Sequence, residues 1–114
     1  MSARILAPVI ASISLFCISF SFAADSNMQI LLQRARQNDI QAQFYLGNAY
    51  ANGLGIASNP EQAAYWYKKA AEQGKPGAQY NLGLLYASGK GVPQSDELAV
   101  HWYGKAAEND LPNA

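Results

Sequence analysis

The sequence has one cysteine and one histidine among its 114 residues, and its eight basic residues are balanced by eight acidic ones. The cysteine, Cys17, lies in an apolar N-terminal segment. The chain beyond that segment can therefore form neither an internal disulfide nor a metal site with thiolate ligands. The lack of a basic excess argues against nucleic-acid binding, which depends on many cationic side chains. The whole sequence is near-neutral, and half of its residues are apolar.

The N-terminal segment has the pattern of a secretory signal peptide over residues 1–23. Arg4 supplies a positive charge, an apolar stretch follows it, and Ser21 and Ala23 are small residues spaced as in a cleavage site after Ala23. An uncleaved anchor is the alternative, because the apolar stretch approaches the shortest length that spans a bilayer. The segment predicts an exported bacterial protein that is periplasmic or secreted.

A repeat with an offset of 36 residues runs through the rest of the chain. Residues 42–72 align without a gap with residues 78–108, so that Trp66-Tyr67 falls on Trp102-Tyr103. The alignment also matches Ala42-Gln43 with Ala78-Gln79, Leu46-Gly47 with Leu82-Gly83, Gly53 with Gly89, and Lys69-Ala70-Ala71-Glu72 with Lys105-Ala106-Ala107-Glu108. Because rare aromatic residues match as well as common alanines, the chain contains two copies of one structural unit.

Each copy predicts two helices joined by a loop. The first helices, about 41–52 and 77–88, carry a helical stripe of apolar residues and end at glycines suited to a left-handed conformation. The second helices, about 60–73 and 96–109, follow Asn59 and Ser95, whose side-chain oxygens can accept the first free backbone N–H groups.

Two features of these helices predict close packing. The second helices share an apolar stripe, which in the first copy consists of Ala63, Trp66, Tyr67, Ala70 and Ala71. Gly47 and Gly83 stand in the middle of the first helices, where glycine is unfavourable by roughly 1 kcal/mol compared with alanine. Their recurrence predicts that an aromatic ring or a neighbouring helix packs against bare backbone at both positions.

The repeat predicts an all-α fold: an α/α solenoid of two helix pairs preceded by one helix. We expect a capping helix within residues 24–40, a first repeat over 41–76 and a second over 77–112. Helix 96–109 would leave part of its apolar stripe open, because the sequence holds no third repeat to cover it. We therefore expect weak self-association through this helix, or a partner bound to it.

The repeated residues resemble Sel1-like repeats, a family related to tetratricopeptide repeats. The second copy carries the motif as Ala78-Gln79, Leu82-Gly83, Tyr86, Gly89, Gly91-Val92, Ala99, Trp102-Tyr103 and Lys105-Ala106-Ala107-Glu108. It departs from the family pattern at Asp110, where a glycine is usual. The resemblance implies a right-handed superhelix whose first helices line a concave face, and an adaptor role in exported bacterial proteins.

The outward face of the first helices is the candidate binding surface. Its residues are Phe44, Tyr45, Asn48, Asn52, Tyr80, Asn81, Leu84 and Ser88. Amides among aromatic rings suit an extended peptide, since amides bond its backbone and rings cover its side chains. We predict that a protein or peptide partner binds there. The alternatives are a solvated face with Phe44 and Tyr80 tucked between helices, or a segment of a larger repeat assembly.

Catalysis and metal binding find little support in the sequence. His101 stands off the apolar stripe, and one histidine without a cysteine beyond the leader makes a poor metal site. Some secreted relatives are described as β-lactamases, chemistry that usually needs a serine with lysine three residues later. Ser88 has Lys90 two residues later instead. We therefore expect a protein that is not an enzyme and has no cofactor, with the β-lactamase-like hydrolase as the alternative.

Overall fold

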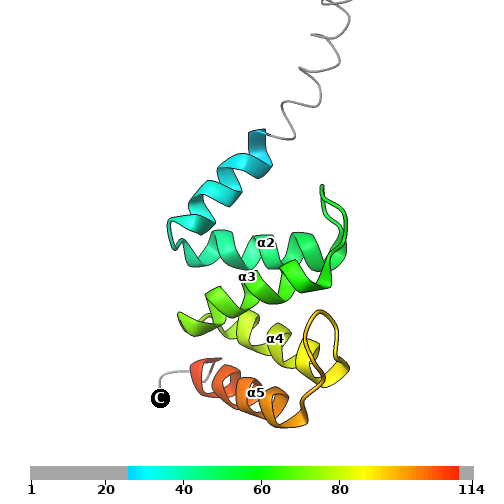
Figure 1. Cartoon of the computed structure of the whole chain (residues 1–114). Helices are drawn as coiled ribbons and strands as arrows, with labels where there is room; N and C mark the ends of the chain where they lie inside the picture. Colours follow the sequence, from blue (N-terminus) through cyan, green and yellow to red (C-terminus); the bar gives the residue numbers. More distant parts are fainter. Residues whose placement is uncertain (1–25, 111–114) are drawn as a thin grey trace, which may run out of the picture. The chain divides into compact units, whose positions relative to one another are not determined.

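The computed structural model describes residues 26–110, and these residues form helices and loops without a strand. A first helix covers residues 26–36 and is followed by α2 (Ile40–Asn52), α3 (Pro60–Glu72), α4 (Pro76–Ser88) and α5 (Asp96–Asp110) (Figure 1). The chain divides into two units, residues 1–30 and 31–114, and all four labelled helices belong to the second. The all-α expectation is confirmed, while the expected signal peptide lies outside the described residues.

The helices begin and end where the sequence predicts. The side chain of Asn59 accepts a hydrogen bond from the backbone of Gln62 at 3.3 Å, and that of Ser95 accepts one from Leu98 at 3.2 Å. Each bond satisfies an N–H group that has no partner within its helix. Helices α2 and α4 end at Gly53 and Gly89, whose φ angles of 69° and 71° lie in the left-handed region.

The labelled helices pack in chain order. Helix α2 pairs with α3, α4 pairs with α5, and α3 packs against α4 to join the two repeats (Figure 1). The core between the repeats combines side chains from three helices: Ala63, Tyr67, Ala70 and Ala71 of α3, Ala78 and Leu82 of α4, and Trp102 of α5. The predicted apolar stripe of α3 is buried throughout, as the repeat pattern required.

The two mid-helix glycines lie against tyrosine rings, as predicted. Tyr67 of α3 covers Gly47, and Tyr103 of α5 covers Gly83. A Cβ atom at Gly83 would lie 2.7 Å from the Tyr103 ring, too close for an ordinary contact. The glycines therefore allow the two helices of each pair to approach with the ring between them.

A pair of buried glutamines bonds successive helices together. Gln43 of α2 donates to the carbonyl of Ala35 in the preceding helix, and Gln79 of α4 donates to the carbonyl of Ala71, both at 3.0 Å. Each glutamine oxygen also accepts a hydrogen bond from the end of its own repeat's second helix, at 2.7 Å from Gln73 and 3.0 Å from Asn109. The matching bonds show that the helix over 26–36 ends like the second helix of a repeat.

Candidate functional site

The predicted binding surface contains five exposed side chains. Tyr45 is 57% exposed on α2, and Tyr80 and Leu84 are 52% and 43% exposed on α4. Asn52 and Ser88 are exposed at the last turns of the same two helices. The Ser88 hydroxyl donates to the carbonyl of Leu84 at 2.9 Å, a bond within its own helix. Large apolar side chains on this face are thus open to a partner, and polar groups lie beside them.

Phe44 lies between the two repeats. Its ring packs against the core, and a Cβ atom at Gly77 would lie 2.9 Å from its Cζ atom. The Lys75 Nζ atom lies 5.1 Å from the centre of the same ring, at cation–π distance. Phe44 therefore contacts Tyr67 of the first repeat as well as the start of the second repeat, and it packs the two repeats together.

Asn48 and Asn81 belong to a hydrogen-bonded group that spans three helices. The Tyr67 hydroxyl of α3 donates to the Asn48 Oδ1 atom of α2 at 2.7 Å. Burial raises the pKa of the Tyr67 phenol above its ordinary value of 10.0, and a hydrogen bond from the Asn81 side chain of α4 opposes this rise. The two asparagines are half-buried, and the bond from Tyr67 fixes the direction of the Asn48 amide.

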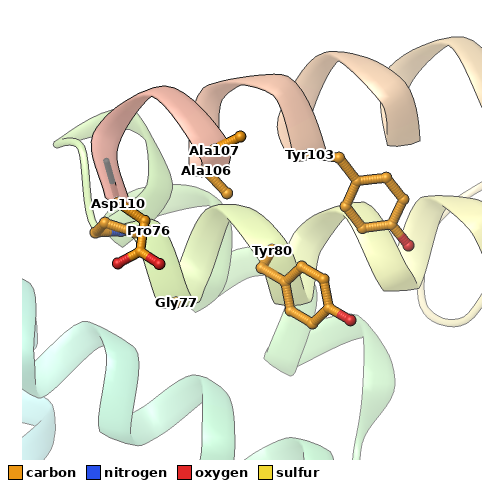
Figure 2. A pocket seen from close by; sticks show the side chains of 7 residues that line it. All are labelled: Pro76, Gly77, Tyr80, Tyr103, Ala106, Ala107 and Asp110. Atoms are coloured by element: carbon orange, nitrogen blue, oxygen red, sulfur yellow. The ribbon is translucent and has the colours of Figure 1, made fainter. Parts of the chain in front are cut away.

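A groove lies between α4 and α5, beside the predicted surface. It encloses about 700 Å³ and is lined by Pro76, Gly77, Tyr80, Tyr103, Ala106, Ala107 and Asp110 (Figure 2). The Tyr80 and Tyr103 rings are 5.5 Å apart. Tyr80 thus borders both the predicted surface and this groove. In the apolar stripe of α5, Ala99, Trp102 and Ala106 are buried, Tyr103 is half-buried and Ala107 is exposed.

Sequence reasoning missed the glutamine bonds and the asparagine pair around Tyr67. The glutamines left a signal, because a polar residue recurs beside the apolar stripe at the repeat offset in Gln43 and Gln79. The asparagines left none, because the repeat places Leu84 at the position of Asn48 and Asn81 at that of Tyr45. The Tyr67 group is therefore peculiar to the junction between the two copies.

The described residues show no arrangement typical of a metal centre. His101 is exposed, and its ring packs edge-on against Trp102 at 5.2 Å. Residues 26–110 hold no cluster of three or more histidine, cysteine, aspartate or glutamate side chains that could bind a metal ion. Within the same residues, no helix has the length and apolar character needed to cross a membrane.

Two solved structures resemble this chain closely. One is a protective antigen of uropathogenic Escherichia coli strains with an SLR fold, which is 40% identical, has a TM-score of 0.71 and is matched over 74% of this chain and 18% of its own. The other is a Sel1 repeat protein from Oxalobacter formigenes, which is 39% identical, has a TM-score of 0.71 and is matched over 74% of this chain and 24% of its own. The chain thus spans less than a quarter of either structure. No curated protein matches it.

The family model of the Sel1 repeat matches the chain twice, over residues 40–75 and 76–111. The two matches follow each other directly and include all four labelled helices. Sel1 repeats commonly serve as protein–protein interaction modules. The all-α repeat fold, the 36-residue offset and the two matches agree, and the chain belongs to the Sel1 repeat family.

Proposed function

We propose that this chain is an exported, non-catalytic adaptor that binds a peptide or protein segment on the outward face of α2 and α4. The observation that carries this proposal is the exposure of Tyr45, Tyr80 and Leu84 on first helices. Large exposed apolar side chains among polar ones are typical of interaction surfaces. The expected concave face of a Sel1-like superhelix, which the first helices would line, supports the same assignment.

The asparagines add directional contacts to this surface. Because Asn48 is held by the Tyr67 hydroxyl, its amide need not be ordered when a ligand binds. An extended peptide offers backbone N–H and C=O groups that such amides can bond, while Tyr45 and Leu84 cover its side chains. The signal-peptide pattern of residues 1–23 supports export, and an exported adaptor would meet its partner in the bacterial envelope, on the cell surface or on a host.

Affinity capture from a bacterial envelope extract tests the surface when the bait is compared with two tyrosine variants. Tyr45→Ala removes an exposed ring from the proposed surface, and Tyr65→Ala removes one that is 50% exposed on α3. We expect a protein retained by the wild-type chain and by Tyr65→Ala to be lost with Tyr45→Ala. Equal retention by both variants contradicts the proposed surface.

The hydrolase of the same repeat family is tested directly. Turnover of a chromogenic β-lactam by the purified protein would favour the enzyme over the adaptor. A substitution in this protein must also abolish the turnover, so that the activity can be assigned to this chain. We expect no turnover above the rate of the buffer, because no serine of the sequence has lysine three residues later.

A further inference from the structure

The charged residues of the four labelled helices all lie on the second helix of each repeat. Neither α2 nor α4 contains an aspartate, glutamate, lysine or arginine, although each has 13 residues. Helix α3 carries Glu61, Lys68, Lys69 and Glu72, and all of them are exposed. Helix α5 likewise begins with two acidic residues and ends with another. The first helices of both repeats therefore present an uncharged face.

Burial does not account for this lack of charge. Tyr45 and Asn52 of α2 are exposed, and so is Ser88 of α4. Exposed positions are where charged side chains normally stand, because they keep their hydration there. A charged group of a partner that was brought against this face would lose its hydration without gaining a counter-ion. An uncharged face that is open to solvent therefore selects against charged partners.

Asn48 determines which polar group this face offers to a ligand. Its Oδ1 atom accepts the hydrogen bond from the Tyr67 hydroxyl at 2.7 Å. An asparagine side chain also has an amide nitrogen with two N–H donors. Since the side chain is half-buried and its oxygen is held by Tyr67, Asn48 offers a ligand these two donors. A ligand that fits them must bring a hydrogen-bond acceptor.

A backbone carbonyl of an extended peptide is an acceptor that brings no charge. Tyr45 stands three residues before Asn48 on the same helix, so that its exposed ring is a neighbour of the amide and can cover a side chain of the peptide. A carboxylate would also accept from Asn48, but neither α2 nor α4 holds a cation to pair with it. Lys75, just before α4, has its ammonium group over the Phe44 ring.

We propose that the outward face of α2 and α4 selects an extended peptide segment without charged side chains, and that a backbone carbonyl of this segment accepts a hydrogen bond from Asn48. The inference rests on the function proposed above and adds the chemical class of the partner. Asn48 and Tyr67 lie where α2, α3 and α4 contact one another, so both repeats that form the site are present. A repeat that followed α5 would stack on the second repeat and not on α2, because repeats of a solenoid contact only their neighbours.

Selection from a phage-displayed library of short random peptides tests the class of partner. The full chain is the bait, and Tyr45→Ala identifies the clones that bind elsewhere. Among clones that need Tyr45, we expect aspartate, glutamate, lysine and arginine to be depleted by about threefold or more compared with the unselected library. Enrichment of either charge among these clones overturns the inference but leaves the proposed function standing. If no clone needs Tyr45, the proposed binding surface fails as well.

Asn48→Asp tests the hydrogen bond with a selected peptide whose two ends are acetylated and amidated. The aspartate keeps an oxygen for the Tyr67 hydroxyl but replaces both donors. We expect binding, measured by fluorescence anisotropy, to weaken by more than about tenfold. Gln62→Glu is the matched control, because it makes the same change from amide to acid at an exposed position of α3 and should leave the affinity unchanged. If Asn48→Asp does not fold, Tyr67→Phe replaces it, since loss of the hydroxyl frees the Asn48 amide and should weaken binding by about threefold or more.

The salt dependence of the same peptide checks that charge plays no part. Its affinity should change by less than about twofold between about 50 mM and 500 mM sodium chloride. Equal or tighter binding by Asn48→Asp overturns the inference, and so does a free C-terminal carboxylate that strengthens binding by more than about tenfold. A dimer of the full chain in light scattering that the peptide dissociates also overturns it, because the occupant of the face would then be a second copy.

Discussion

Glycine stands inside a helix at Gly47, Gly83 and Gly104, and the three positions differ in what lies beside them. Tyrosine rings cover Gly47 and Gly83, whereas a Cβ atom at Gly104 would have nothing within 4 Å. The intrinsic preference of helices for alanine is the same at all three. Whether alanine stabilises or destabilises the protein at each position therefore depends on what surrounds the backbone there. Helix propensity alone does not predict it.

Gly83→Ala should destabilise the protein by about 1–3 kcal/mol, because the added methyl group overlaps the Tyr103 ring and forces the α4–α5 pair apart. Gly104→Ala is the control and should stabilise by about 0.5–1 kcal/mol. Urea unfolding followed by circular dichroism measures both. If Gly83→Ala proves as stabilising as Gly104→Ala, the ring does not restrict that position.

Tyr67 makes stability depend on pH in the alkaline range. Its pKa is raised above 10.0 in the folded protein, mainly by burial, so the unfolded chain loses this proton first as pH rises. The stabilisation that this phenol contributes is fully present below its pKa in the unfolded chain. It is lost as the pH rises from about 10 through the pKa of the phenol in the folded protein. We expect the free energy of unfolding to fall less between about pH 9 and pH 11 in Tyr67→Phe than in the exposed control Tyr45→Phe. Identical pH profiles for the two variants would contradict this.

At the scale of the helix, most of the fold could be predicted from the sequence. Local signals predict which segments are helices and where each begins and ends. They are the apolar periodicity, the cap residues Asn59 and Ser95, and the glycines at helix ends. The contact of α3 with α4 could also be anticipated, because a stripe repeated at a fixed offset must be covered by the next unit. The candidate surface was less predictable, since Phe44 and Tyr80 hold equivalent positions but only Phe44 is covered by a following helix.

The bonds of Gln79 show how elements are joined beyond apolar packing. Gln79→Met preserves the volume but removes two hydrogen bonds, one to the Ala71 carbonyl and one from the Asn109 amide. A hydrogen bond typically contributes about 0.5–1.5 kcal/mol, so we expect the loss of both to destabilise the protein by about 1–3 kcal/mol. Gln41→Met, at an exposed position of α2, should change stability by less than about 0.5 kcal/mol. Equal urea midpoints for the two variants would mean that the glutamine bonds do not hold α4 to α3.

At the scale of the whole molecule, the N-terminal segment bears on where the proposed adaptor would act. If residues 1–23 are a signal peptide, the protein isolated from the periplasm or the medium begins at Ala24, because the small residues Ser21 and Ala23 place cleavage there. Intact mass spectrometry of each cell fraction checks this. A full-length mass confined to the membrane fraction would favour the uncleaved anchor, and the partner would then be sought at the membrane surface.

The two repeats should unfold together rather than one after the other. Their shared core takes side chains from α3, α4 and α5, and Phe44 of the first repeat packs against Gly77 of the second. Each repeat also carries one of the two tryptophans, so Trp66→Phe leaves a reporter only in the second repeat and Trp102→Phe only in the first. In both variants we expect the fluorescence midpoint in urea to coincide with the midpoint from circular dichroism.

Leu82→Ala extends this test across the junction, because Leu82 is fully buried where α4 meets the core. The substitution should destabilise the protein by about 2–5 kcal/mol and should shift both tryptophan signals by the same amount. A repeat array whose neighbours interact weakly would behave differently, since its units unfold separately. Separate midpoints for the two reporters, or a shift confined to the second repeat, would therefore show that the α3–α4 contact does not couple the repeats.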